Sequence, residues 1–87
     1  MKIKENFMLR KVADTFVVVP VGDAVAGFNG MINLNEAGAF LWQLLENETT
    51  EEAVVASMLE HYDVSEELAK ADVEKFIAQL SDADLLD

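Results

Sequence analysis

The chain has 87 residues, enough for one small domain with a single core, and 52% of them are hydrophobic. It contains no cysteine, which excludes disulfides, thiolate metal sites and cysteine nucleophiles, and it has no apolar run near the roughly 20 residues that span a bilayer. Its net charge of -11 would repel a phosphate backbone and therefore disfavours binding to nucleic acid.

The charged residues are unevenly distributed along the chain. Four of the six basic residues lie within the first eleven positions, so the rest of the sequence is strongly acidic. A basic peptide or a basic protein surface would be attracted to this acidic part, although acidity also keeps a small domain in solution. No signal-like apolar segment follows the first charged residues, and we expect a cytoplasmic protein that forms one domain over residues 1–87.

Two strands are predicted near the start, over residues 7–13 and 15–21, with Asp14 and Thr15 as the hairpin turn between them. Apolar and polar residues alternate loosely in the first strand. The second strand is rich in β-branched residues and is apolar on both faces. We expect one of these faces to meet the helices, while the other is either covered by the N-terminal segment or left as an adhesive surface.

Residues 22–30 form a predicted connection that holds three of the four glycines. The Asn29–Gly30 pair is a tight-turn signal, and Val25 and Phe28 are expected to fold back onto the sheet. The connection has no lysine and no G-x-G-x-x-G pattern, so a nucleotide-binding loop is not favoured.

A strand over residues 31–34 is predicted to pass almost directly into a helix over about residues 36–46. The hydrophobic period changes at Asn35, whose side chain is placed to cap the helix. Gly38 and Trp42 flank the apolar stripe of this helix, so we expect another backbone to pass close there. The stripe consists of Ala37, Phe40, Leu41, Leu44 and Leu45.

Two further helices are predicted from their caps and apolar stripes. Thr49, with Glu52 three residues later, matches a capping box at the start of the first, and Ser65 is expected to cap the second. Leu85 and Leu86 are expected to tuck under the helices. The stripes consist of Val54, Val55, Met58, Leu59 and Tyr62 in the first helix, and of Ala69, Val73, Phe76, Ile77 and Leu80 in the second.

Side chains that could carry catalysis are sparse. His61 is the only histidine, and the sequence places no nucleophile beside it. The carboxylates fall on exposed helical faces and in first turns, where solvation accounts for them. We therefore expect a protein that is not an enzyme and that holds no metal and no cofactor. An exposed edge of the small sheet, with unpaired N–H and C=O groups, is expected to be its most reactive feature, since such an edge can accept an extended peptide.

Nearly the whole chain resembles one known family. The strand TFVVVPV, a glycine-bearing loop, the segment GMINLNEAGAFLWQLLEN and a helix that starts with TTEE follow one another in the order of that family. The last helix carries its D-V-x-x-F-(I/L)-x-x-L pattern, here from Asp72 to Leu80. In these features the sequence is similar to the coenzyme PQQ synthesis protein D (PqqD-like) family.

The resemblance implies an α+β, winged-helix-like fold, with a three-stranded antiparallel N-terminal sheet packed on a three-helix bundle. It also implies a recognition element for ribosomally synthesised and post-translationally modified peptides (a RiPP recognition element). Such a non-catalytic domain binds the leader of a precursor peptide and presents it to a modifying enzyme, often a radical S-adenosylmethionine (radical SAM) protein. The pathway, PQQ biosynthesis or the modification of another peptide, stays open.

In that family the leader adds as a strand beside the third strand, in a groove closed by the third helix. The resemblance therefore implies a peptide-binding site at the corresponding positions of this chain. These positions are Met31, Ile32, Asn33, Leu34, Asp72, Val73, Phe76 and Gln79.

Two other functions remain open. A winged-helix regulator that binds nucleic acid would share the architecture, but its recognition helix should be basic, and the last predicted helix carries more acidic than basic residues. A structural or dimerisation domain, which forms a homodimer through the doubly apolar second strand, is the other alternative.

Overall fold

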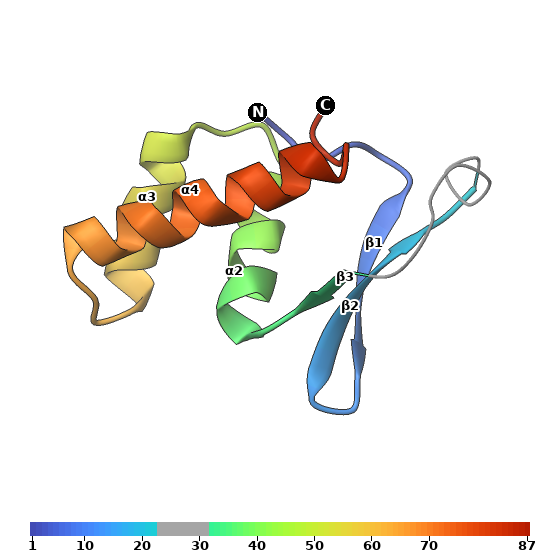
Figure 1. The fold of residues 1–87 in the computed structure, drawn as a ribbon, viewed down its shortest axis with the longest axis horizontal. Coiled ribbons are helices and arrows are strands. Elements are labelled where there is room, and N and C mark those ends of the chain that lie inside the picture. Colours follow the sequence, from blue (N-terminus) through green and yellow to red (C-terminus); the bar gives the residue numbers. More distant parts are fainter. Residues whose placement is uncertain (23–31) are drawn as a thin grey trace.

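The computed structural model describes residues 1–22 and 32–87 (Figure 1). Within these ranges the elements follow in the order β1 (Phe7–Val12), β2 (Thr15–Pro20), β3 (Ile32–Leu34), α2 (Glu36–Leu45), α3 (Glu51–His61) and α4 (Glu66–Asp82). This order confirms the expected α+β class, with an N-terminal antiparallel sheet followed by helices. No helix in the described ranges is long and apolar enough to cross a membrane. The predictions for Val25, Phe28 and the Asn29–Gly30 turn lie outside the described residues.

The β1–β2 hairpin closes through a two-residue turn. The register pairs Val12 with Thr15, which leaves Ala13 and Asp14 as the turn. The predicted turn at Asp14 and Thr15 is therefore wrong by one residue, because the β-branched Thr15 belongs to the strand. Ala13 has a φ of 57°, the positive value that tight hairpin turns adopt at their first central residue.

Among the described strands β2 is central, so β1 and β3 form the two edges of the described sheet. In an antiparallel ladder, residues that exchange both backbone hydrogen bonds with their partner alternate with residues that point both groups the other way. The 2.8 Å bond from Val21 N to the Asn6 carbonyl continues the β1–β2 register and sets this alternation. Arg10 and Val17 then form a hydrogen-bonded pair, so the pair of Val17 and Asn33 does not. The N–H and C=O of Asn33 therefore point away from β2, to the side of β3 that no other described strand occupies.

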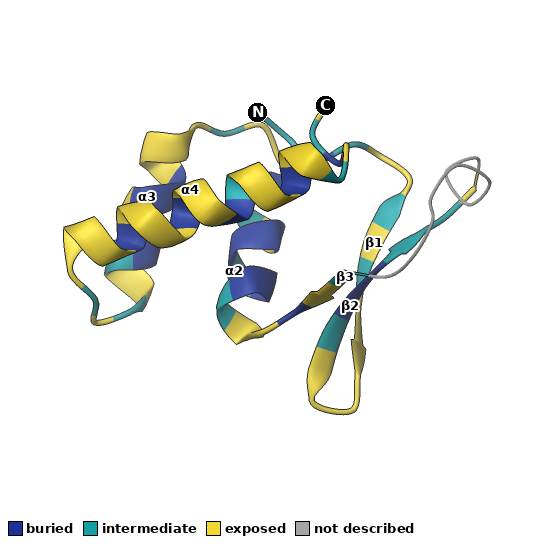
Figure 2. Cartoon of the chain, in the orientation of Figure 1, coloured by how far each residue is buried: buried dark blue, intermediate teal, exposed yellow. Residues whose placement is uncertain are grey.

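The core lies mainly among α2, α3 and α4, where Figure 2 shows most of the buried segments, and Val18 of β2 and Leu34 of β3 extend it to the sheet. Trp42 of α2 belongs to this core and is completely buried. Both faces of β2 are shielded, since Val18 is fully buried in the core and Val17, on the opposite face, is 8% exposed. The large apolar side chains that stay exposed on the described sheet belong to β1, where Met8 is 45% and Val12 is 59% exposed.

A single residue makes the step from β3 into α2. The side-chain oxygen of Asn35 accepts a 2.8 Å hydrogen bond from the N–H of Gly38, which confirms the predicted cap. A Cβ at Gly38 would lie 3.2 Å from the Cβ of Leu34. The close neighbour of Gly38 is therefore the end of β3, not the separate backbone that the sequence suggested. Glycine here lets β3 and the first turn of α2 lie directly against each other.

Thr50 caps α3, because its side chain accepts a 3.1 Å hydrogen bond from the N–H of Ala53. The predicted cap at Thr49, with Glu52 completing a capping box, is wrong by one residue. Thr49 is engaged elsewhere, since its N–H donates to the backbone carbonyl of Met1 at 3.0 Å. The predicted apolar stripe is confirmed by the burial of Val54, Val55 and Met58.

α4 begins at its predicted cap, where Ser65 accepts a 3.1 Å hydrogen bond from the N–H of Leu68. Its buried residues belong to the predicted stripe and are Ala69, Val73, Phe76 and Leu80. After α4 the chain turns under the helices as expected, and Leu85 is completely buried. Ile3 forms an antiparallel bridge with Leu86, so the two ends of the chain lie side by side (Figure 1). No local sequence pattern predicts this pairing of the two ends.

Candidate functional site

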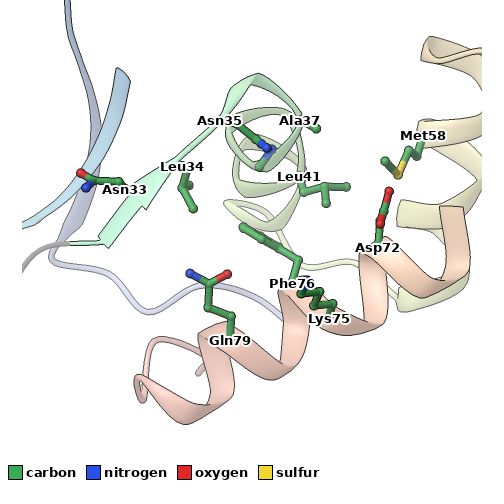
Figure 3. Close-up of a pocket in the computed structure, with 11 residues that line it drawn as sticks. Asn33, Leu34, Asn35, Ala37, Leu41, Met58, Asp72, Lys75, Phe76 and Gln79 are labelled. Carbon is green, nitrogen blue, oxygen red and sulfur yellow. The ribbon is translucent and has the colours of Figure 1, made fainter. Parts of the chain in front are cut away.

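A groove runs between β3 and one face of α4 (Figure 3), and we call it the β3–α4 groove. Its deeper part has a volume of about 280 Å³, and a shallower part continues it towards the C-terminal end of α4. Lys75 and Gln79 line both parts, which therefore lie next to each other along α4. The other lining residues are Asn33, Leu34, Asn35, Ala37, Gly38, Leu41, Met58, Asp72 and Phe76 in the deeper part, and Ile32, Ala78, Asp82 and Ala83 in the shallower part.

The floor of the deeper part is apolar. Leu34 of β3, Leu41 of α2 and Met58 of α3 line it and are at most 7% exposed. Phe76 projects from α4 towards β3 and α2 (Figure 3) and is 6% exposed. These four side chains come from four different elements, so the floor exists only in the folded chain. Apolar surface with a few polar groups around it is typical of a ligand-binding groove.

The rim of the groove on the α4 side is polar. Asp72, Lys75, Gln79 and Asp82 are exposed and recur at three- and four-residue spacing, so their side chains follow one another along one face of the helix. In Figure 3 the Gln79 side chain points from α4 towards β3. The rim therefore offers hydrogen-bonding and charged groups beside the apolar floor.

β3 contributes main-chain groups to the opposite wall. Asn33 lines the groove, and its N–H and C=O point to the free edge of the strand, away from β2. No backbone hydrogen bond found within residues 1–22 and 32–87 engages these two groups, so a further chain that lies extended beside β3 could bond to them. Because Asn35 caps α2 directly after the strand, the position of this edge relative to the helical layer is tightly constrained.

Three charged residues line the groove, and they are Lys75 and, on either side of it along α4, Asp72 and Asp82. Lys75 is the one cation among the described lining residues. The ion pairs found within residues 1–22 and 32–87 join the N-terminal amine to Glu48 and Lys4 to Asp84, and both lie outside the groove. The three charges of the rim are therefore available to a ligand.

Most residues expected for the site come together in this groove. Asn33, Leu34, Asp72, Phe76 and Gln79 line its deeper part, and Ile32 lines its shallower part. Val73 does not line it, because this residue points into the core and is completely buried. Met31 lies outside the described residues.

Sequence reasoning missed three residues of the α4 wall, Lys75, Ala78 and Asp82. The helical repeat contained the necessary signal, since these positions lie three, six and ten residues after Asp72 on the same side of the helix. From the sequence, Met58 is expected only in the apolar stripe of its helix. Met58 also lines the groove, because α3 packs against α4.

The groove does not contain a recognisable catalytic arrangement. Its described lining has no histidine, and no group of three or more metal-binding side chains occurs within the described ranges. His61 lies at the end of α3, where its ring stacks on Phe40 with the ring centroids 4.5 Å apart. An apolar floor, a polar rim and a free strand edge are suited to holding an extended segment of chain.

A sequence model of one family, described as coenzyme PQQ synthesis protein D (PqqD), matches residues 15–86. The chain belongs to the PqqD family. The matched range starts at β2 and ends after α4, so every residue of the β3–α4 groove falls within the PqqD match. A search of curated proteins found no significant match.

Among solved structures, this member of the PqqD family is similar to TbiB1 in complex with the TbiA(beta) leader peptide. The two chains are 23% identical, the match covers 100% of this chain and 95% of TbiB1, and the TM-score is 0.79. At this level of identity the similarity establishes a shared fold, which agrees with the arrangement of strands and helices described above.

Proposed function

We propose that this protein is a RiPP recognition element. It binds the leader segment of a ribosomally made precursor peptide, which adds as a strand to β3 and lies in the β3–α4 groove. The observation that carries the proposal is a free strand edge beside an apolar groove in a member of the PqqD family. The similarity to TbiB1, whose structure was determined with a leader peptide, supports the same class of ligand.

The dimensions of the groove suit a short extended segment. Its α4 wall runs from Asp72 to Asp82, which is about 15 Å along a helix axis at about 1.5 Å per residue. An extended peptide rises about 3.3 Å per residue, so about four or five residues would fill this length. Main-chain bonds to Asn33 would supply affinity, and the apolar floor would select one of the alternate side chains.

The protein acts in this proposal by binding, and a separate modifying enzyme carries out the chemistry. A radical SAM protein is our first candidate for that enzyme. The recognition domain raises the local concentration of the precursor at the enzyme, because a tethered substrate reacts at an effective concentration set by its linker. No cofactor on this chain is required for that role.

An amide chemical-shift titration of the isotope-labelled protein tests the proposal. The ligands are synthetic leader segments of short precursor peptides encoded next to the gene. We expect saturable shifts concentrated in residues 32–34 and 72–83, the two walls of the groove. Saturable shifts confined to β1, or no shift with any of these peptides, would contradict the proposal.

A matched pair of variants separates loss of the groove from general disturbance of the helices. Ala78 is exposed on the groove side of α4, and Ala56 is exposed on α3 outside the groove. Ala78→Trp fills the groove with an indole and should weaken leader binding at least tenfold, whereas Ala56→Trp should leave it unchanged. Equal affinity of the two variants would argue against binding in the β3–α4 groove.

A further inference from the structure

Lys75 occupies a distinct electrostatic position in the groove. It lines both the deeper and the shallower part, and no ion pair within the described ranges involves it. Asp72 lies three residues before it and Asp82 seven residues after it on the same wall. A ligand that runs along this wall therefore meets one positive charge between two negative ones.

The acidic surroundings of Lys75 increase its influence on where an acidic ligand can bind. Residues 32–87 contain two lysines and fourteen acidic residues, so the helical part as a whole repels an acidic ligand. Along the helix axis, at about 1.5 Å per residue, Asp72 lies about 4.5 Å and Asp82 about 10.5 Å from Lys75. Asp72 is therefore within the screening length of about 8–10 Å and partly offsets the attraction of Lys75, whereas Asp82 is beyond it. A carboxylate is favoured where it contacts Lys75 directly and is disfavoured where it lies nearer to Asp72 or Asp82.

Because of the residue spacing of an extended peptide, this charge pattern can fix the register of the peptide, that is, which of its residues lies opposite Lys75. Side chains on one face of a strand repeat every two residues, which is about 7 Å. A shift of the peptide by two residues would move its carboxylate from Lys75 towards one of the aspartates, where like charges repel. The charges of the rim thus distinguish the position of an acidic residue as well as its presence.

We propose, on the basis of the function proposed above, that Lys75 is a specificity determinant of the groove. The bound peptide carries one aspartate or glutamate opposite Lys75, and neutral or basic residues face Asp72 and Asp82. Its substrate class is thus an extended leader with an apolar anchor for the floor and a carboxylate at a fixed distance from that anchor.

Selection from a phage-displayed library of random dodecapeptides tests this inference. The library is selected in parallel on the unmodified protein, on Lys75→Glu and on Lys70→Glu. Lys70 is an exposed lysine of α4 outside the groove lining, so both variants make the same change in net charge on the same helix. Circular dichroism confirms that each variant is folded.

We expect peptides selected on the unmodified protein to share an acidic residue at a fixed distance from an apolar one. Selection on Lys75→Glu should replace the acidic residue with lysine or arginine, and selection on Lys70→Glu should keep it. For one selected peptide, replacing its aspartate with asparagine should weaken binding to the unmodified protein about fivefold, as for a partly exposed ion pair. The same replacement should strengthen binding to Lys75→Glu.

The failures of the two proposals are distinguishable. Enriched peptides that share the groove compete with one another and bind Ala56→Trp but not Ala78→Trp. If such peptides have no acidic residue at a fixed position, the role of Lys75 is overturned and the peptide-binding function stays intact. The same change of preference in Lys70→Glu and Lys75→Glu would also overturn it, since net charge would then explain the effect. If no peptide is enriched on the unmodified protein, both proposals are wrong.

Discussion

The two edges of the sheet differ in what lies beside them. β1 has six residues and β3 has three, so by length alone β1 is the better template for an added strand. β3, however, runs beside α4 and opens into an apolar groove, whereas the outer side chains of β1 face solvent. On the proposed function, the edge of β3 is selective and that of β1 is not, because side chains of α4 line a groove next to β3.

Charge adds to this contrast. β1 ends in the sequence Arg10–Lys11–Val12, and Lys11 lies 5.8 Å from the ring centroid of Phe16. Charged side chains on an edge strand discourage pairing with other chains. β3 carries no charged residue. We therefore expect β1 to be the protected edge of the described sheet and β3 the accessible one, although Met8 and Val12 of β1 are exposed.

The largest expected difference is in folding stability, between a residue of α4 beside β3 and a residue of β1. Phe76→Ala removes a buried ring that belongs both to the core and to the groove floor, and should lower the free energy of unfolding by about 3–5 kcal/mol. Met8→Ala removes an exposed side chain from β1 and should change it by less than about 1 kcal/mol. Urea denaturation of both variants measures the difference. A large loss in Met8→Ala would show that β1 is covered in solution.

Loss of one outward N–H from each edge should affect peptide binding unequally. Asn33→Pro removes a donor at the free edge of β3 without removing a bond to β2, and should weaken a library-selected peptide at least tenfold. Lys11 stands in the corresponding non-hydrogen-bonded position of β1, so Lys11→Pro is the matched control and should keep the affinity. Fluorescence anisotropy with a labelled peptide measures both. Unchanged affinity in Asn33→Pro would rule out strand addition at this position.

Much of the fold could be predicted because its signals are local. Asn35 and Ser65 cap α2 and α4 through their own side chains, and the apolar stripe of α4 follows from the helical repeat. The turn at Asp14 and the cap at Thr49 were each misplaced by one residue. In both cases a contact between separate segments decides the boundary, namely the register of β2 against β1 and the bond from Thr49 to Met1.

The candidate site could be predicted only in part, for a related reason. The resemblance to the PqqD family implied Asp72, Phe76 and Gln79 as site residues, but the depth of the groove depends on how α2 and α3 pack against it. Val73, which the resemblance also places in the site, is completely buried in the core, because packing decides which of two adjacent helix faces meets the other elements. Which residues of a stripe remain accessible is therefore a property of the assembled layers.

An intermediate effect is expected from the helix cap that fixes β3. Asn35→Ala and Ser65→Ala each remove one side-chain acceptor from a helix start, and each should lower the free energy of unfolding by about 1 kcal/mol. Asn35 also lines the groove and joins β3 to α2, so its loss should additionally weaken peptide binding about twofold to threefold. Equal peptide affinity in the two variants would show that the cap stabilises the helix without positioning the edge.

The smallest effect is expected at Arg10, on the protected edge. This residue is exposed, lies on the face of β1 opposite to Phe7 and Leu9, and belongs to the basic part of the chain. Arg10→Ala should change the unfolding free energy by less than about 0.5 kcal/mol and the peptide affinity by less than about twofold, because exposed charges more than about 10 Å apart are largely screened. Titration at two salt concentrations measures this small change. A large, salt-dependent loss of affinity would mean that the peptide also contacts β1. The distinction between a selective edge at β3 and a protected edge at β1 would then be wrong.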